Sequence, residues 1–279
     1  MSKIPRAALR YYGGKWQLAP WIISHFPSHV CYVEPFCGAA SVFLRKQPAE
    51  FEVLNDIDGD LVNFFLVLRE QAEKLIRAID LTPYSRAEYD LAWQPTYDPL
   101  ERARHYYVRS WQGWGGSKGA IQTSTSWRFQ FTTKRGQSIV DDWNQTEHLY
   151  AIAARLKQAQ MENDEAIDVI RRYDDKETLF YLDPPYLAQT RSHRWAELAY
   201  HHEADLEYHR LLLDTIKHLD GMVIISGYHS TLYDQELSDW TSVEKKAITT
   251  NVANRKVEIL WLSPNTTAID RLPLFSLGS

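Results

Sequence analysis

The strongest chemical pattern in the sequence is the run Asp183-Pro184-Pro185-Tyr186, which directly follows a short apolar stretch. The adjacent prolines fix the backbone and remove two N–H donors, so carbonyl oxygens are left to accept hydrogen bonds. A carboxylate and a carbonyl in this arrangement can accept both hydrogens of an amino group, and the tyrosine offers a flat face to an aromatic base. The run predicts a site for the amino group of a base; a proline-rich turn after a strand is the alternative.

A second pattern, Val33 to Ser41, is an apolar run that leads into a turn of small residues. Gly38, with Ala39 and Ala40 beside it, lets a ligand approach the backbone closely, as nucleotide sites require. The segment is not the dinucleotide-binding fingerprint, which needs three spaced glycines. Taken alone, it is as compatible with a structural turn as with a ligand-binding turn.

Three carboxylates, Asp56, Asp58 and Asp60, follow the next strand-like run. A carboxylate after the second strand is suitably placed to bind the ribose hydroxyls of an adenosine ligand. A calcium loop is the rival interpretation. It is excluded because its sixth position is Leu61 instead of glycine and its twelfth is Val67 instead of glutamate.

Other motifs that could bind phosphate or metal are incomplete. The run Gly13-Gly14-Lys15-Trp16 lacks the leading glycine and the Ser/Thr of a phosphate loop. After His202, Leu206 stands where a zinc-protease helix needs its second histidine. Cys31 and Cys37 form neither a disulfide framework nor a zinc pattern. We therefore expect no metal ion.

The 279 residues, of which 44% are hydrophobic and 24% charged, have the composition of a soluble globular protein. The apolar runs are too short to cross a bilayer, and Met1 to Tyr12 lacks the apolar core of a signal peptide. We expect a cytoplasmic protein that does not contact membranes. A monomer is the default expectation for its oligomeric state.

Charge is distributed unevenly along the chain. The net charge is −5, yet Leu100 to Val140 contains seven basic residues and one acidic residue. A basic island on an acidic body is an electrostatic footprint for a polyanion, because phosphate contacts need clustered cations more than a high global charge. A solvated helical face with scattered cations is the alternative interpretation.

Short apolar runs alternate with helical patterns, which predicts an α/β fold: a mostly parallel sheet with helices on both faces. The predicted strands are residues 31–35, 51–55, 159–163, 178–182, 222–226, 243–249 and 256–262. Helices are predicted at 60–79 and 203–219, where apolar residues recur with helical spacing. The short link at 251–255 favours a hairpin, hence an antiparallel strand at the end of the sheet.

Residues 83–144 do not follow this alternation. They contain helical pieces, then the Gly- and Ser-rich run 113–126, then aromatic and basic residues. We interpret this segment as an insertion with its own packing and a mobile loop, held between strands of the core.

Four motifs occur in one order from the N-terminus to about Pro264. They are Tyr11 to Lys15, Glu34 to Leu44, Asn55 to Ile57, and Asp183 to Tyr186. Together they resemble the Dam-like class of N6-adenine DNA methyltransferases. The resemblance implies a Rossmann-like seven-stranded methyltransferase sheet, with residues 1–82 and 145–279 as the catalytic domain. Residues 83–144 are then an inserted, mainly helical target-recognition domain.

The resemblance also implies the chemistry, which is transfer of a methyl group from S-adenosylmethionine to the N6 amino group of an adenine flipped out of DNA. The product of the cofactor is S-adenosylhomocysteine. The implied catalytic residues are Asp183, Pro184, Pro185 and Tyr186. The implied cofactor contacts are Tyr11, Lys15, Glu34, Pro35, Phe36, Gly38, Ala39, Asp56, Asp164 and Asp183. For the acidic contact after the third strand, Asn163 and Glu165 compete with Asp164.

The implied DNA contacts are Arg109, Lys118, Trp127, Arg128, Lys134 and Arg135. Residues 191–202 are expected to close over the flipped base. The recognition segment matches the basic–aromatic pattern of the family only loosely, so the target sequence does not carry over. Rival hypotheses are transfer to cytosine amino groups or to RNA, and a non-catalytic DNA-binding protein on the same scaffold. Restriction–modification, prophage and regulatory roles are all open.

Overall fold

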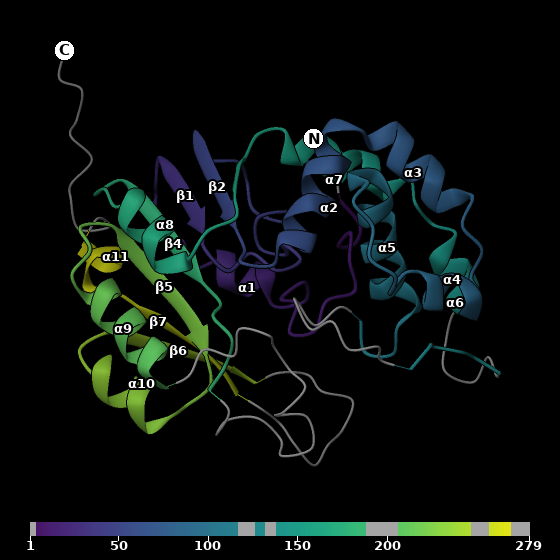
Figure 1. Cartoon of the computed structure of the whole chain (residues 1–279). Helices are drawn as coiled ribbons and strands as arrows, with labels where there is room; N and C mark the ends of the chain where they lie inside the picture. The colour runs from purple at the N-terminus through teal and green to yellow at the C-terminus, as the bar shows by residue number, and fades with distance from the viewer. Residues whose placement is uncertain (1–3, 117–125, 132–137, 188–205, 247–256, 269–279) are drawn as a thin grey trace.

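The computed structural model describes residues 4–116, 126–131, 138–187, 206–246 and 257–268 (Figure 1). This part of the chain contains a seven-stranded sheet with the order β3-β2-β1-β4-β5-β7-β6. Its strands are β1 (Cys31–Glu34), β2 (Phe51–Asn55), β3 (Gln160–Glu162), β4 (Thr178–Leu182), β5 (Met222–Gly227), β6 (Thr241–Lys246) and β7 (Val257–Leu262). The predicted α/β fold and its seven strands are confirmed.

The strands at the centre of the sheet run parallel. β1 pairs in parallel with β2 and β4, β2 with β3, and β4 with β5. β7 runs antiparallel to β5 and β6, so the predicted antiparallel pairing of the last two strands is confirmed, with the antiparallel strand one place in from the edge. The predicted short link at 251–255 lies outside the described residues. Glu34, Asn55 and Leu182, the last residues of β1, β2 and β4, therefore share the edge where such sheets bind ligands.

Helices cover both faces of the sheet, as predicted (Figure 1). Because neighbouring residues of a strand face opposite sides, Leu179 and Tyr181 of β4 enter one core, while Phe180 and Leu182 enter the other. The first core includes α1 (Ala19–Ile23), α2 (Gly59–Glu70), α3 (Ala72–Asp80), α5 (Pro99–Gln112) and α7 (His148–Leu156). The second includes α8 (Ala166–Arg172), α9 (Leu206–Lys217) and α10 (Thr231–Glu236), and α11 (Pro264–Ala268) packs beside β5.

The prediction of one helix at residues 60–79 is wrong, because this stretch forms two helices, α2 and α3. Gln71 separates them with φ −132° and ψ 39°, outside the helical region. Leu68 of α2 and Leu75 and Ile79 of α3 are buried in the same core. The apolar spacing therefore continues across a break that spacing alone does not show. The helix predicted at 203–219 corresponds to α9.

Three helices, α4 (Arg86–Leu91), α5 and α6 (Ile139–Trp143), lie in the segment predicted as an insertion. α5 packs against α2 and α3, and its Ala103, Tyr107 and Val108 belong to the same core as the sheet. The division of the chain at residues 83 and 144 stays a prediction. None of the helices in the described ranges combines the length and the apolar composition that a membrane span needs.

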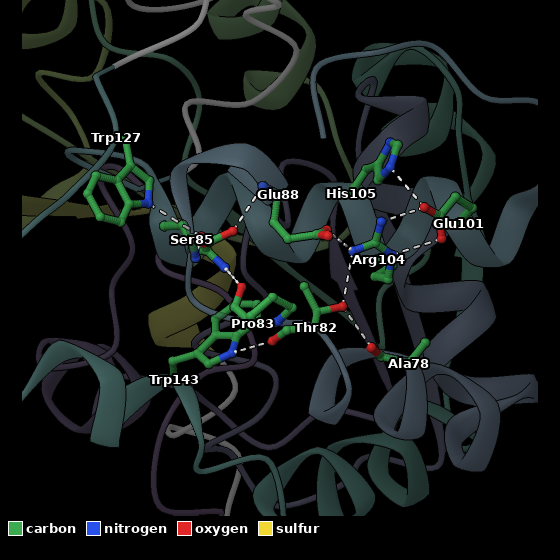
Figure 2. A network of polar contacts seen from close by, with 11 residues as sticks. Ala78, Thr82, Pro83, Ser85, Glu88, Glu101, Arg104, His105, Trp127 and Trp143 are labelled. Atoms are coloured by element: carbon green, nitrogen blue, oxygen red, sulfur yellow. Dashed lines mark hydrogen bonds and ion pairs between the residues drawn. The ribbon is translucent and has the colours of Figure 1, made fainter. Parts of the chain in front are cut away.

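Arg104 of α5 is a buried cation that ties several helices together (Figure 2). Its guanidinium donates to the Thr82 hydroxyl at 3.0 Å and to the Glu88 carboxylate at 2.8 Å. Glu101 supplies a second carboxylate at 2.8 Å. Thr82 lies just beyond α3 and Glu88 lies in α4. Because a buried charge needs such partners, this member of the basic island is paired inside the fold.

Candidate active site

Asp183 follows the last residue of β4 and lies at the carboxyl edge of the sheet. Its Oδ1 atom accepts a hydrogen bond from the Ser226 hydroxyl at 2.9 Å and lies 3.0 Å from Lys15 Nζ. The Tyr186 hydroxyl is 3.3 Å from the same oxygen. Among the described residues, the hydrogen bonds and ion pairs of this carboxylate all involve Oδ1. Asp183 also lines the cleft described below.

Lys15 is a buried cation, with 6% of its surface exposed. Its Nζ atom lies 3.0 Å from Asp183 and 3.3 Å from Glu258 Oε1, and it donates to the Tyr186 hydroxyl. Burial alone lowers the pKa of an ammonium group, but the carboxylates of Asp183 and Glu258 outweigh it and raise the pKa of Lys15. Lys15 is thus a fixed positive charge beside Asp183.

In the turn after β1, the glycine Gly38 packs against the aromatic ring of Tyr11. Gly38 has φ +46°, in the left-handed region that favours glycine, and a Cβ there would lie 3.0 Å from Cε1 of Tyr11. Ala40, in the same turn, has φ 51°, which residues other than glycine rarely adopt. Backbone strain of this kind concentrates at ligand sites, so the turn is a candidate for close contact with a ligand.

The buried side chain of Glu34 contacts residues on both sides of the turn after β1. Its carboxylate accepts hydrogen bonds from the Tyr32 hydroxyl at 2.9 Å and from the backbone N–H of Phe43 at 3.2 Å. Burial raises the pKa of Glu34 to about 8. The side chain is therefore a structural clamp between β1 and the segment that follows the turn.

A cleft of about 290 Å³, a volume that includes space open to solvent, lies between these elements. Its lining contains the following predicted cofactor contacts: Tyr11, Lys15, Glu34, Phe36, Gly38, Ala39 and Asp183. The predicted contacts Pro35, Asp56 and Asp164 lie outside the lining. Nowhere in the described ranges do three or more His, Cys, Asp or Glu side chains gather as metal ligands would.

Asp56 lies next to the Gly38 turn, at the end of β2. Its carboxylate accepts hydrogen bonds from the backbone N–H groups of Gly38 and Asp58, each at 2.9 Å. The amide of Asn163 donates to the Asp56 carbonyl at 2.7 Å, which brings the segment after β3 to the same place. The carboxylate of Asp164 itself pairs with Arg172 at 2.8 Å. The choice among Asn163, Asp164 and Glu165 stays a prediction.

We expect the affinity for the cofactor to depend on pH through Asp56. Burial raises the pKa of its carboxyl to about 7, and the ionised form is the better acceptor for ribose hydroxyls. Affinity should therefore fall by about tenfold from pH 8 to pH 6, as the carboxyl becomes protonated. Titration with S-adenosylhomocysteine at constant ionic strength measures this dependence. The Asp56→Asn variant should bind more weakly and without this slope; an unchanged slope would contradict the assignment.

A side chain at position 38 should obstruct the cleft. We expect Gly38→Ala to weaken cofactor binding by about tenfold, because the methyl group displaces the Tyr11 ring and the turn becomes strained by about 1–3 kcal/mol. Calorimetric titration with S-adenosylhomocysteine measures the affinity, and thermal unfolding of the same sample checks that the variant is folded. Wild-type affinity in the folded variant would show that no ligand approaches this turn.

The predicted DNA-binding residues differ from one another in their burial and in their contacts. Arg109 lies 2.9 Å from the Asp60 carboxylate, and its side chain is 17% exposed. Trp127 and Arg128 are half-buried. A single antiparallel β-bridge pairs Trp127 with Gly113, the residue that follows α5. Lys118, Lys134 and Arg135 lie outside the described residues, as does the predicted lid at 191–202. The DNA-binding role of these residues stays a prediction.

Exposed aromatic rings continue from Trp127. Its ring lies 6.4 Å from that of Phe129, which lies 6.3 Å from that of Phe131. Phe129 is 60% exposed and Phe131 87% exposed. The guanidinium of Arg86 lies 4.9 Å from the Trp127 ring. We name Trp127, Phe129 and Phe131 the aromatic face; by contrast, Trp111 of the basic island is buried in the core.

Ser226, Tyr228 and Glu258 are members of the site that sequence analysis did not identify. Ser226 bonds Asp183, the Tyr228 ring lies 4.6 Å from that of Tyr186, and Glu258 accepts the Tyr186 hydroxyl at 2.7 Å. The sequence holds one signal for them, since Glu258 is a charged residue inside the apolar strand Val257–Leu262. A buried charge of this kind needs polar partners.

The strand order, the antiparallel seventh strand and Asp183 at the end of β4 define a methyltransferase-like α/β fold. Residues 11–251 match the model of the D12 class N6 adenine-specific DNA methyltransferases. This match covers most of the chain, which therefore belongs to that family.

Comparison with individual relatives gives the following sequence identities. The DNA adenine methylase of Escherichia coli (strain K12) is 28% identical over 188 residues, and the same figures hold for that of Salmonella typhi. The DNA adenine methylase of Vibrio cholerae serotype O1 is 42% identical over 74 residues, 26% of each chain. The aligned region spans 65% of this chain and 65% of the length of the Escherichia coli relative.

Proposed function

We propose that this chain transfers a methyl group from S-adenosylmethionine to the N6 amino group of adenine in DNA. The observation that carries the proposal is the geometry of Asp183. One carboxylate oxygen is held by Lys15 and Ser226, and the residue lines the cleft at the Gly38 turn. Membership of the adenine-specific family supports the choice of base and of polymer.

The residues around the cleft suit S-adenosylmethionine. Gly38 packs against the Tyr11 ring, which a Cβ would approach to 3.0 Å, and both residues line the cleft. The Lys15 ammonium suits a carboxylate group, and the Asp56 carboxylate at the neighbouring strand end suits ribose hydroxyls. When bound, the cofactor supplies an electrophilic methyl group on a sulfonium ion.

Asp183 and Pro184 prepare the amino group. The lone pair of an adenine amino nitrogen is conjugated into the ring, which makes this nitrogen a poor nucleophile. Hydrogen bonds from its two N–H groups to Asp183 Oδ2 and to the Pro184 carbonyl favour a pyramidal nitrogen, whose lone pair then points out of the ring plane. The rate enhancement arises chiefly from this positioning, and no covalent intermediate with the enzyme is needed.

The adenine leaves the DNA stack to reach Asp183, because a base inside a duplex cannot enter a site at the edge of the sheet. Tyr186 offers the stacking surface for the flipped base. Its ring is supported by Tyr228, with 4.6 Å between the ring centroids.

DNA is the proposed partner, and the aromatic face is the proposed contact in the described part of the chain. The exposed rings of Phe129 and Phe131, with Arg86 over the neighbouring Trp127 ring, suit a surface that meets bases and phosphates together. The predicted contacts Lys118, Lys134 and Arg135 lie outside the described residues and stay predictions. A cytoplasmic location and a monomeric state complete the proposal.

A transfer assay with methyl-labelled S-adenosylmethionine tests the choice of polymer. Unmethylated genomic DNA and total RNA are incubated separately with the wild-type protein and with Asp183→Ala. The proposal predicts label in DNA with the wild type, little label in RNA, and none above background with the variant. Label in RNA alone would favour the RNA hypothesis. Binding of cofactor and DNA without transfer would favour the non-catalytic scaffold.

A further inference from the structure

Glu258 lies in β7, outside the segments that the motifs identify, yet it reaches the centre of the site. It shares a face of β7 with Leu260 and Leu262, which enter the core that also contains Tyr181. Glu258 is 2% exposed. The antiparallel pairing of β7 with β5 therefore places a buried carboxylate next to the end of β4.

Within the described part of the chain, the hydrogen bond and the ion pair of the Glu258 side chain both involve partners of Asp183. Its Oε1 atom accepts a hydrogen bond from the Tyr186 hydroxyl at 2.7 Å and lies 3.3 Å from Lys15 Nζ. Lys15 and Tyr186 are also bound to Asp183. Two carboxylates thus share one cation and one phenol.

The Tyr186 hydroxyl has a single proton, which it can donate to only one of the two carboxylates at a time. Tyr186 lies 2.7 Å from Glu258 but 3.3 Å from Asp183, so the proton is directed to Glu258. Lys15 donates to the phenol oxygen. The remaining contacts of Asp183 Oδ1 are then those with Lys15 and Ser226. The carboxylate of Asp183 stays a strong hydrogen-bond acceptor at Oδ2.

We propose that Glu258 is a positioning residue for methyl transfer, which holds the Tyr186 hydroxyl and the Lys15 ammonium in place around Asp183. This inference rests on the proposed function. Without Glu258, the phenol donates to Asp183, which weakens the acceptor for the adenine amino group. The Tyr186 ring also loses the anchor that fixes its orientation for stacking.

Two replacements of similar size separate this role from simple space filling. Glu258→Gln keeps an acceptor oxygen, whereas Glu258→Leu removes it. We expect Glu258→Leu to lower kcat by about 10- to 100-fold through misplacement of the reacting groups, with Glu258→Gln in between. The Kd for S-adenosylhomocysteine should change much less than kcat. A structural role alone predicts that Leu and Gln behave alike.

A double-mutant cycle with Tyr186→Phe tests the route of the effect. Because Glu258 acts largely through the Tyr186 hydroxyl, the loss caused by either Glu258 variant should be several-fold smaller in the Tyr186→Phe background. If Glu258→Leu does not fold, as judged by its thermal transition, the same cycle with Glu258→Gln gives the answer. Losses that simply multiply would overturn the proposal, as would wild-type kcat in both Glu258 variants.

Glu244→Leu is the matched control. Glu244 lies on the neighbouring strand β6, its side chain is 55% exposed, and it contacts His229 instead of the site. This variant should methylate DNA at the wild-type rate to within about twofold. An inactive wild type would overturn the proposed function and this inference with it. An active wild type with unaffected Glu258 variants would overturn the inference alone.

Discussion

Asp183→Ala should strongly slow methyl transfer while the protein stays folded and still binds the cofactor. The carboxylate supplies the acceptor at Oδ2, and removal of one such group from a prepared site costs roughly 10²- to 10³-fold in rate. Lys15 keeps a carboxylate partner in Glu258 at 3.3 Å, so the variant leaves no isolated buried cation. Single-turnover kinetics with labelled cofactor measure the rate, and titration with S-adenosylhomocysteine measures the affinity.

Asp183→Asn provides a graded comparison, because its amide carbonyl can still accept one hydrogen bond. We expect a rate between those of the wild type and Asp183→Ala. Asp214→Ala on α9, whose side chain is 69% exposed, is the matched control and should react as the wild type does. A normal rate in Asp183→Ala would remove this residue from the mechanism.

Glu52→Gln should cause a large loss of stability although it leaves the site untouched. Glu52 of β2 is fully buried and pairs with Lys46 and with both terminal nitrogens of Arg155, whose side chains are 2% and 3% exposed. These cations lower the pKa of Glu52 even though burial alone would raise it. Loss of the shared carboxylate leaves two buried cations, which costs about 3–5 kcal/mol.

Urea unfolding followed by circular dichroism measures this loss. Glu70→Gln is the control, because Glu70 pairs with Arg69 at 2.7 Å but is 59% exposed. A surface pair of this kind contributes at most about 1 kcal/mol. Equal midpoints for the two variants would show that the buried network does not stabilise the fold.

The sequence predicts the fold well where a buried strand appears as a short apolar run. The strand that ends at Leu182 is apolar on both faces, and in the structure all its residues are buried. The motifs at Glu34, Asn55 and Asp183 each follow such a strand, so their meeting at one edge is a consequence of parallel pairing. That much of the site was predictable before any coordinates.

Charge partners were not predictable in the same way, because they are distant in sequence. Arg102 and Arg109 were counted in a basic island for DNA, but both pair with Asp60, which lies 42 and 49 residues away. Tyr186 and Glu258 are 72 residues apart. The local sequence shows that a charged residue is present. Its partner of opposite charge becomes visible only when α5 packs on α2 and β7 packs on β5.

The most direct test of the central claim is the identity of the methylated nucleoside. DNA from a methylation-deficient host that expresses the wild type is digested to nucleosides and analysed by mass spectrometry, with the Asp183→Ala variant in parallel. We predict N6-methyldeoxyadenosine with the wild type and background levels with the variant. Methylation of the cytosine amino group instead, or N6-methyldeoxyadenosine at equal levels in both cultures, would contradict the account.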